Sequence, residues 1–218
     1  MSDSLASKKK ILKNFLNICL LHGWNNTSLE EAVKASGFKE NKYFKDIYDL
    51  INFFIEQGNE ELEKKAKKIK FEDLRIRDKI KELVKLRILV EEKNKNALKA
   101  LLTISKGRRI PTLLKNSYKI SDVMWKIIKD KSTNYSFYTK RIILSKIFIK
   151  TLICFIDDDS KNYQDSWKLL DNEIEKVMKI GKIKAVFSNV SKGLKNIKPT
   201  ACNLKEKLKE LPFFRLMK

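Results

Sequence analysis

The residue types that usually perform acid–base, redox or metal chemistry are sparse in this chain of 218 residues. His22 is the only histidine and has only Cys19 near it, so no cluster of Cys and His is available to hold zinc. The three cysteines, Cys19, Cys154 and Cys202, form no C-x-x-C pair and indicate a reducing compartment. We therefore expect no metal site and no disulfide scaffold.

The remaining motif candidates also argue against catalysis. Asp157, Asp158 and Asp159 form the densest acidic run, but no second carboxylate cluster accompanies them, so a solvated loop is favoured over a Mg²⁺ site. The sequence contains no phosphate-binding glycine loop, no dinucleotide fingerprint and no serine nucleophile elbow. A di-iron bundle needs Glu-x-x-His pairs, which a chain with one histidine cannot supply. We predict no catalytic residues, no cofactor and no enzymatic activity.

The composition indicates an all-α fold. Six Gly and three Pro leave little material for the tight turns of an antiparallel sheet, and 43% hydrophobic residues are enough for a buried core. The net charge is +21, but most of the basic residues are lysine, and the richness in Lys, Asn and Ile suggests AT-rich codons. Because arginine is the preferred reader of guanine and phosphate, the charge alone is weak evidence for nucleic-acid binding.

Apolar residues at helical spacing predict a series of amphipathic helices. The spacing Thr27 to Glu30 matches a capping box, and Gly37 is suited to end a helix. Together with a short third helix, these elements form a helix-turn-helix candidate at the N-terminus. The predicted helices cover residues 7–21, 28–36, 39–45, 48–70, 74–90, 96–104, 120–130, 135–156 and 163–180, with loops at 106–111, 131–134 and 157–162.

Two segments differ from this background. Residues 142–156 are apolar nearly all round, which predicts a helix buried at the centre of a bundle, either as plain core or as part of the wall of an apolar cavity. The segment from residue 176 to 218 is strongly basic and amphipathic. A helix of this kind either packs on the bundle or lies in an anionic membrane surface. The residues that we expect to enter the membrane are Ile183, Phe187, Val190, Leu194 and Ile197.

The arrangement of a helix-turn-helix before a large helical bundle resembles the TetR family of regulators. A more specific likeness lies in Asp122-Val-Met-Trp125, in the run from Asp130 to Arg141, and in Asp165-Ser-Trp167. These motifs resemble the Coq-nine family of ubiquinone-biosynthesis accessory proteins. The resemblance implies a TetR-like fold that binds isoprenoid lipids and works with the di-iron demethoxyubiquinone hydroxylase.

The resemblance also implies roles for particular residues. The family's surface for the hydroxylase falls on Asp122, Met124, Trp125, Phe137, Tyr138 and Arg141. Phe137 stands where other members carry tryptophan, so an aromatic anchor is kept without its indole N–H. A lipid carrier needs an apolar cavity, because each buried CH₂ contributes about 0.8 kcal/mol. For its wall we propose four residues at helical spacing: Leu144, Phe148, Leu152 and Phe155.

Three regions are therefore expected: a helix-turn-helix-like region at 1–47, a lipid-binding bundle at 48–180 and a membrane-binding tail at 181–218. The predicted function is to bind an isoprenoid quinone-type lipid, or ubiquinone precursor, and present it to the hydroxylase at an anionic membrane surface. The expected location is the cytoplasm, peripherally on a bacterial inner membrane, or the matrix side of a mitochondrial membrane. The TetR likeness implies a homodimer.

The alternative function is a TetR-type DNA-binding regulator with an apolar ligand pocket. The acidic Glu40 in the expected reading helix argues against binding to a specific DNA sequence.

Overall fold

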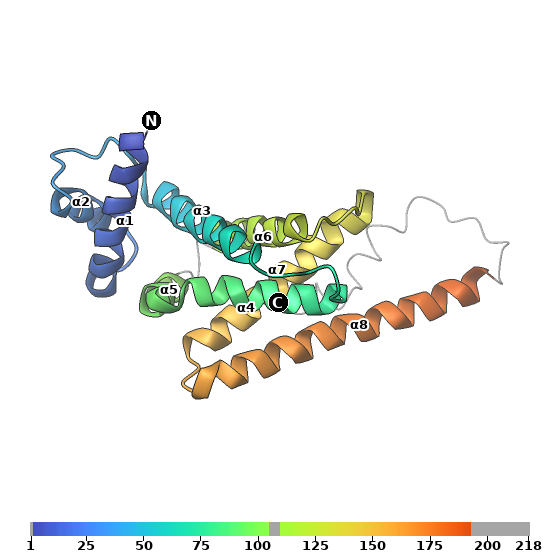
Figure 1. The fold of residues 1–218 in the computed structure, drawn as a ribbon. Coiled ribbons are helices and arrows are strands. Elements are labelled where there is room, and N and C mark those ends of the chain that lie inside the picture. The colour runs from blue at the N-terminus through green and yellow to red at the C-terminus, as the bar shows by residue number, and fades with distance from the viewer. Residues whose placement is uncertain (1, 105–109, 193–218) are drawn as a thin grey trace. The chain divides into compact units, whose positions relative to one another are not determined.

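The computed structural model describes residues 2–104 and 110–192, and those residues form eight α-helices, two short 3-10 helices and no strand (Figure 1). The all-α prediction is confirmed. The helices, with the 3-10 helices as η, are α1 Ser2–His22, α2 Asn26–Ala35, α3 Ile47–Ala66, α4 Ile76–Val90, η1 Glu92–Asn94, α5 Lys95–Ile104, α6 Ile110–Ile127, α7 Asn134–Ile156, η2 Lys161–Tyr163 and α8 Gln164–Lys192. The chain divides into two compact units, residues 1–176 and 177–218.

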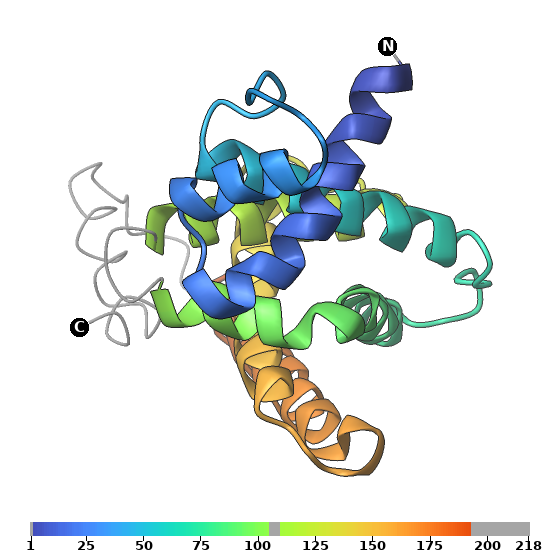
Figure 2. The ribbon, with the colours of Figure 1, turned by 90° about the vertical axis from the view of Figure 1, so that its left-hand side faces the viewer.

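The first unit is built around the pairing of its central helices. Helix α3 packs against α4 and α6, and α7 packs against α4, α5 and α6. At one end of the unit α1 and α2 pack on each other, and α1 also contacts α5 (Figure 2). Trp24 fixes this junction: it is fully buried, its indole nitrogen donates to the carbonyl of Ala97 at 2.9 Å, and its ring contacts those of Phe15 and Phe54. The N-terminal helices therefore share one core with the bundle.

Helix ends follow local side-chain chemistry, with one shift from the predicted cap. Helix α2 begins at Asn26 and its N-cap is Asn25, whose side chain accepts from the backbone N–H of Ser28, so the cap is not at the predicted Thr27 capping box. Asp46 caps α3 in the same way through the N–H of Asp49. Gly37 adopts a left-handed conformation, φ +84°, directly after α2, as predicted for the residue that ends it.

The predicted short helix at 39–45 is wrong. The segment between α2 and α3 consists of turns and bends. Asn41 accepts hydrogen bonds from the backbone N–H groups of Tyr43 and Phe44, and this local turn competes with helix formation. Phe44 is buried against Phe53, so the loop is held by its aromatic side chains. Residues 36–46 thus lack the helix that was expected to read a DNA groove. This removes one of the two features that favoured a DNA-binding regulator; the other is the net charge of +21.

Two other helices differ from prediction. Helix α6 begins at Ile110, ten residues earlier than expected, with Pro111 in its first turn, where a missing backbone N–H costs no helical hydrogen bond. Helix α7 begins one residue before the predicted start and ends at the predicted residue, but it is not buried all round. Ile142 and Ile153 are 41% and 50% exposed, while Leu144, Phe148 and Phe155 lie in the core. One side of this apolar helix therefore faces outward.

Candidate functional site

The exposed side of α7 carries an apolar stripe near its N-terminal end. Tyr135, Tyr138 and Ile142 lie three and four residues apart, so they share one face of the helix, and they are 65%, 59% and 41% exposed. We call these three residues the α7 stripe. Large apolar side chains that remain exposed together on one helix face commonly mark a surface for another protein.

An ion pair between the buried Arg141 and the partly exposed Asp122 lies beneath the stripe. The guanidinium of Arg141 is 2% exposed, donates to Asp122 on α6 at 2.6 Å and donates to the carbonyl of Phe137 at 3.0 Å. It also stacks on the Phe137 ring, with Cζ 3.3 Å from the ring centre. Phe137 in turn contacts the ring of Tyr138 edge to face at 5.2 Å. The orientation of Tyr138 is therefore linked to the pairing of α6 and α7.

A second carboxylate, that of Asp130, stabilises the turn between α6 and α7. Asp130, in the turn between α6 and α7, pairs with Lys140 at 2.6 Å and accepts from Ser132. Burial by itself raises the pKa of Asp130, but the hydrogen bonds of Lys140 and Ser132 outweigh it and hold the pKa below its ordinary value. The ammonium of Lys140 also lies 5.0 Å from the ring centre of Trp125. Lys140 thus links the turn to both helices, through its ion pair with Asp130 and its contact with the Trp125 ring.

The six residues predicted to contact the hydroxylase lie together, but they do not all reach the surface. Tyr138 is exposed, and Asp122 and Phe137 are partly exposed. The other three are buried: Met124 at 0%, Trp125 at 8% and Arg141 at 2% exposure. Positions 122 and 124 lie on different faces of α6, a distinction that the sequence motif does not make. Met124, Trp125 and Arg141 therefore support the surface from behind rather than forming it.

An apolar cavity of about 40 Å³ lies among α3, α4, α5, α6 and α7. Most of its lining is aliphatic or aromatic, and Phe148 and Leu152 of the predicted wall belong to it. Leu144 and Phe155 are buried but do not line it; Phe155 packs on Tyr163 and Trp167 instead. A space of this size holds a few water molecules. A longer ligand requires the surrounding helices to move apart.

Four polar residues also line the cavity, and the sequence analysis did not single them out. Arg87 and Glu91 form an ion pair at 2.8 Å, with 2% and 6% of their side chains exposed. Asn116 and Ser117 approach from α6 and are 1% and 2% exposed. The side-chain oxygen of Asn116 has no hydrogen-bond partner among the described residues. The spacing of Arg87 and Glu91 is that of an ordinary surface pair on a helix, so only the fold reveals their burial.

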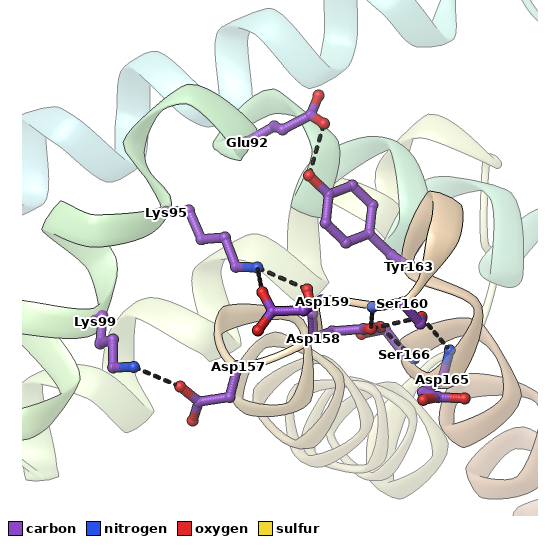
Figure 3. Close-up of polar contacts among 10 residues, drawn as sticks. All are labelled: Glu92, Lys95, Lys99, Asp157, Asp158, Asp159, Ser160, Tyr163, Asp165 and Ser166. Carbon is purple, nitrogen blue, oxygen red and sulfur yellow. Dashed lines mark hydrogen bonds and ion pairs between the residues drawn. The ribbon is translucent and has the colours of Figure 1, made fainter.

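The acidic run 157–159 forms the turn between α7 and α8, and each carboxylate has its own partner (Figure 3). Asp157 pairs with Lys99 at 2.7 Å, and the exposed Asp159 lies 3.8 Å from Lys95, which also donates to the carbonyl of Asp158. Asp158 is buried and accepts from the backbone and hydroxyl groups of Ser160 and Ser166. The three groups face different partners, which matches the loop interpretation and not a shared metal site.

Asp158 gives the turn a defined acid sensitivity. Burial raises the pKa of Asp158, but the hydrogen bonds from Ser160 and Ser166 overcome this effect and lower the pKa well below the ordinary value. A depressed folded-state pKa contributes stability that is present above the unfolded pKa, near 4, and is lost as the pH falls. Asp158→Asn should therefore lower the urea midpoint at pH 7, and its difference from the wild type should shrink below about pH 4. Asp159→Asn, at an exposed position, is the control. A difference that stays constant across this pH range contradicts the account.

The buried thiol of Cys19 and the possible metal ligands were the other candidates for a reactive site. Cys19 is fully buried, and burial raises the pKa of its thiol to about 11, so the group stays protonated. Across residues 2–104 and 110–192, no three His, Cys, Asp or Glu side chains group as metal ligands. Within the same ranges no helix combines the length and the apolar character needed to span a bilayer.

The predicted membrane-binding residues fall at the end of the described chain. Ile183, Phe187 and Val190 belong to the backbone of α8, which continues to Lys192. Their side chains, and all of Leu194 and Ile197, lie outside the described residues. The role of these five residues stays a prediction.

The described residues form an all-helical bundle with an outward-facing aromatic stripe and an internal apolar cavity, an architecture consistent with the predicted TetR-like bundle. The COQ9 family model matches residues 110–181, which include α6, α7 and the first part of α8. The chain is 26% identical to human ubiquinone biosynthesis protein COQ9, mitochondrial, over 89% of its own length and 66% of the relative. It is 28% identical to the COQ9-B protein of Xenopus laevis over 94% of this chain and 75% of the relative.

A more distant relative is the probable ubiquinone biosynthesis protein coq9 of Dictyostelium discoideum, 21% identical over 81% of this chain and 61% of that protein. The chain thus spans about two thirds of the length of the human relative. These matches confirm the resemblance indicated by the motifs between Asp122 and Trp167: the chain is a relative of the COQ9 proteins.

Proposed function

We propose that this protein is an accessory factor of ubiquinone biosynthesis that binds an isoprenoid quinone-type lipid and presents it to the demethoxyubiquinone hydroxylase. The observation that carries the proposal is the similarity to relatives named as ubiquinone biosynthesis proteins over about nine tenths of the chain. The family match includes α7, which carries the α7 stripe, and α6, and both helices contribute to the cavity lining. We assign no reaction to the chain itself.

The α7 stripe is the proposed contact for the hydroxylase. Tyrosine supplies a large apolar area and a hydroxyl at low cost in side-chain entropy, which is why it often dominates binding energy at interfaces. Tyr138 stands at the centre of the stripe, with the Arg141 and Asp122 pair behind it. Asp122 and Phe137 reach the same surface in part. The rigid support favours a preformed binding surface.

The cavity is the proposed place where the lipid begins to enter the bundle. Its walls are mostly apolar, with Phe148 and Leu152 contributed by α7. Because each buried CH₂ contributes about 0.8 kcal/mol, a polyprenyl chain provides a large driving force for separating the helices around a small preformed space. The bound state is therefore expected to have a larger cavity than the ligand-free one.

The basic tail is the proposed attachment to the membrane. Residues 176–218 carry twelve Lys or Arg and two Glu, and lysines of this density are attracted to anionic lipid headgroups. We place the protein at a membrane surface, on the cytoplasmic side of a bacterial inner membrane or the matrix side of a mitochondrial membrane. A homodimer of the TetR type is part of the same proposal.

The proposal predicts that the hydroxylase of the same organism is retained by the immobilised full-length protein. An unrelated di-iron carboxylate protein of similar size and charge should be washed off, because the contact depends on the α7 stripe and not on net charge. Retention should also persist at elevated salt, since a mainly apolar contact is screened little. Equal retention of the two proteins, or release of both at moderate salt, contradicts the proposed partnership.

A further inference from the structure

The cavity has a polar side whose hydrogen-bonding capacity is incompletely used. Asn116 is 1% exposed, and its side-chain oxygen finds no partner within the described residues. Leaving a buried amide oxygen unpaired costs free energy, and buried polar groups are nearly always paired. Because Asn116 lines the cavity, a group placed there can supply the missing hydrogen bond.

The charges around the cavity favour an uncharged group. The guanidinium of Arg87 donates to Glu91 at 2.8 Å and to Asn59 at 3.2 Å, and Glu91 also accepts from Asn94 at 3.0 Å. The charge of Arg87 is therefore already neutralised by a buried partner. An anionic headgroup would have to compete with Glu91 for the guanidinium, and a cation would meet Arg87, so both are disfavoured by the cost of disrupting a buried pair.

The space around Arg87 is also closed on one side. A methyl group at Gly58 would lie 2.3 Å from Nη2 of Arg87 and 2.4 Å from Oε1 of Glu91, which shows how tightly α3 covers the pair. Little room remains there for an additional ion or its hydration shell. The open hydrogen-bonding position is therefore at Asn116, which lines the same cavity as the apolar residues Ile120, Leu101 and Phe148.

From this arrangement we infer that the cavity binds a neutral hydroxyl- or carbonyl-bearing headgroup, inserted head first, with Asn116 as the residue that recognises it. A phenol hydroxyl donates to the amide oxygen of Asn116, and a quinone carbonyl accepts from its NH₂ group after a rotation of the amide. The apolar body of the ligand then lies along the aliphatic lining. The inference rests on the proposed lipid-binding function and adds to it the chemical class and the orientation of the ligand.

The test compares three probes of one shape on the full-length protein by isothermal titration: para-hexylphenol, hexylbenzene and para-hexylbenzoate. The phenol should bind about 3-fold to 10-fold more tightly than hexylbenzene, the effect of one net hydrogen bond. The charged benzoate should bind more weakly than either. Equal affinity for phenol and hydrocarbon, or tightest binding of the benzoate, overturns the inference.

The Asn116→Leu variant tests whether Asn116 is the residue that causes the preference for the phenol. It should abolish the preference for the phenol while keeping or improving the binding of hexylbenzene, and it removes a buried unpaired oxygen, so the variant should fold. Asn116→Val is the second variant in case leucine is too large. Ser121→Ala changes a buried hydroxyl five residues further along α6 that does not line the cavity, and it should keep the preference. An Asn116→Leu protein that still prefers the phenol contradicts the inference.

Failure of the inference can be distinguished from failure of the proposed function. If isoprenoid lipid co-purifies with the wild type but the probes show no preference for the phenol, lipid carriage stands and head-first recognition by Asn116 is wrong. If no lipid co-purifies and none of the probes binds, both are wrong.

Discussion

Glu91→Ala should lower the free energy of unfolding by about 3–5 kcal/mol, the largest effect on stability that we expect from a single substitution in this chain. Glu91 is the only carboxylate that pairs with Arg87 in the described structure, and both side chains are almost fully buried. Removing it leaves a guanidinium charge in the bundle without compensation. Urea denaturation followed by circular dichroism measures the difference directly.

Two controls make this result specific. Glu60→Ala removes an exposed carboxylate from α3 and should change stability by less than about 0.5 kcal/mol. The double variant Arg87→Met with Glu91→Leu should recover most of the loss, since apolar residues of similar volume often replace a buried ion pair at little cost. If Glu91→Ala is as stable as Glu60→Ala, the pair is not buried in solution as the structure describes.

Tyr138→Ala should weaken binding of the hydroxylase by about 10-fold or more with little change in stability. The side chain is 59% exposed, so its removal leaves no internal cavity, and it stands at the centre of the α7 stripe. Surface plasmon resonance with immobilised hydroxylase measures the change in Kd.

Ile153→Ala is the matched control for Tyr138→Ala. It removes an apolar side chain of 50% exposure from the same helix, more than three turns beyond Ile142 and outside the stripe. A Tyr138→Ala protein that binds as tightly as Ile153→Ala contradicts the partner surface. A lysine at Met124 is no test of binding, because that position is fully buried and a charge there destabilises the fold.

The periodicity of apolar residues was sufficient to predict most helices but not what lies between them. The boundaries of α4, α5 and α7 fall within about two residues of prediction because hydrophobic spacing and helix-ending residues agree there. The segment 39–45 fails because the Asn41 side chain and the buried Phe44 stabilise a loop, an effect that helix periodicity does not include. The early start of α6 was missed because Pro111 was interpreted as part of a loop.

Prediction of the candidate sites was limited in a similar way, because each site depends on contacts between residues that are far apart in the sequence. The motif from Asp122 to Arg141 identified the right corner of the fold, and the structure places all six of its residues at the α6–α7 junction. Sequence could not tell that Met124 and Arg141 point into the bundle while Tyr138 faces outward. Arg87, Glu91 and Asn116 come from two helices, and their meeting around one cavity depends on how α4 and α6 pack.

The most direct test of the proposed function is mass spectrometry of the organic extract of the purified protein beside a control protein prepared in the same way. We predict that an isoprenoid quinone or its precursor is enriched on this protein. Phe148→Trp, which fills space in the cavity, should reduce the amount bound per folded molecule. If the extract contains the same lipids in the same amounts as the control, or if Phe148→Trp leaves an enriched lipid unchanged, lipid carriage through this cavity is contradicted.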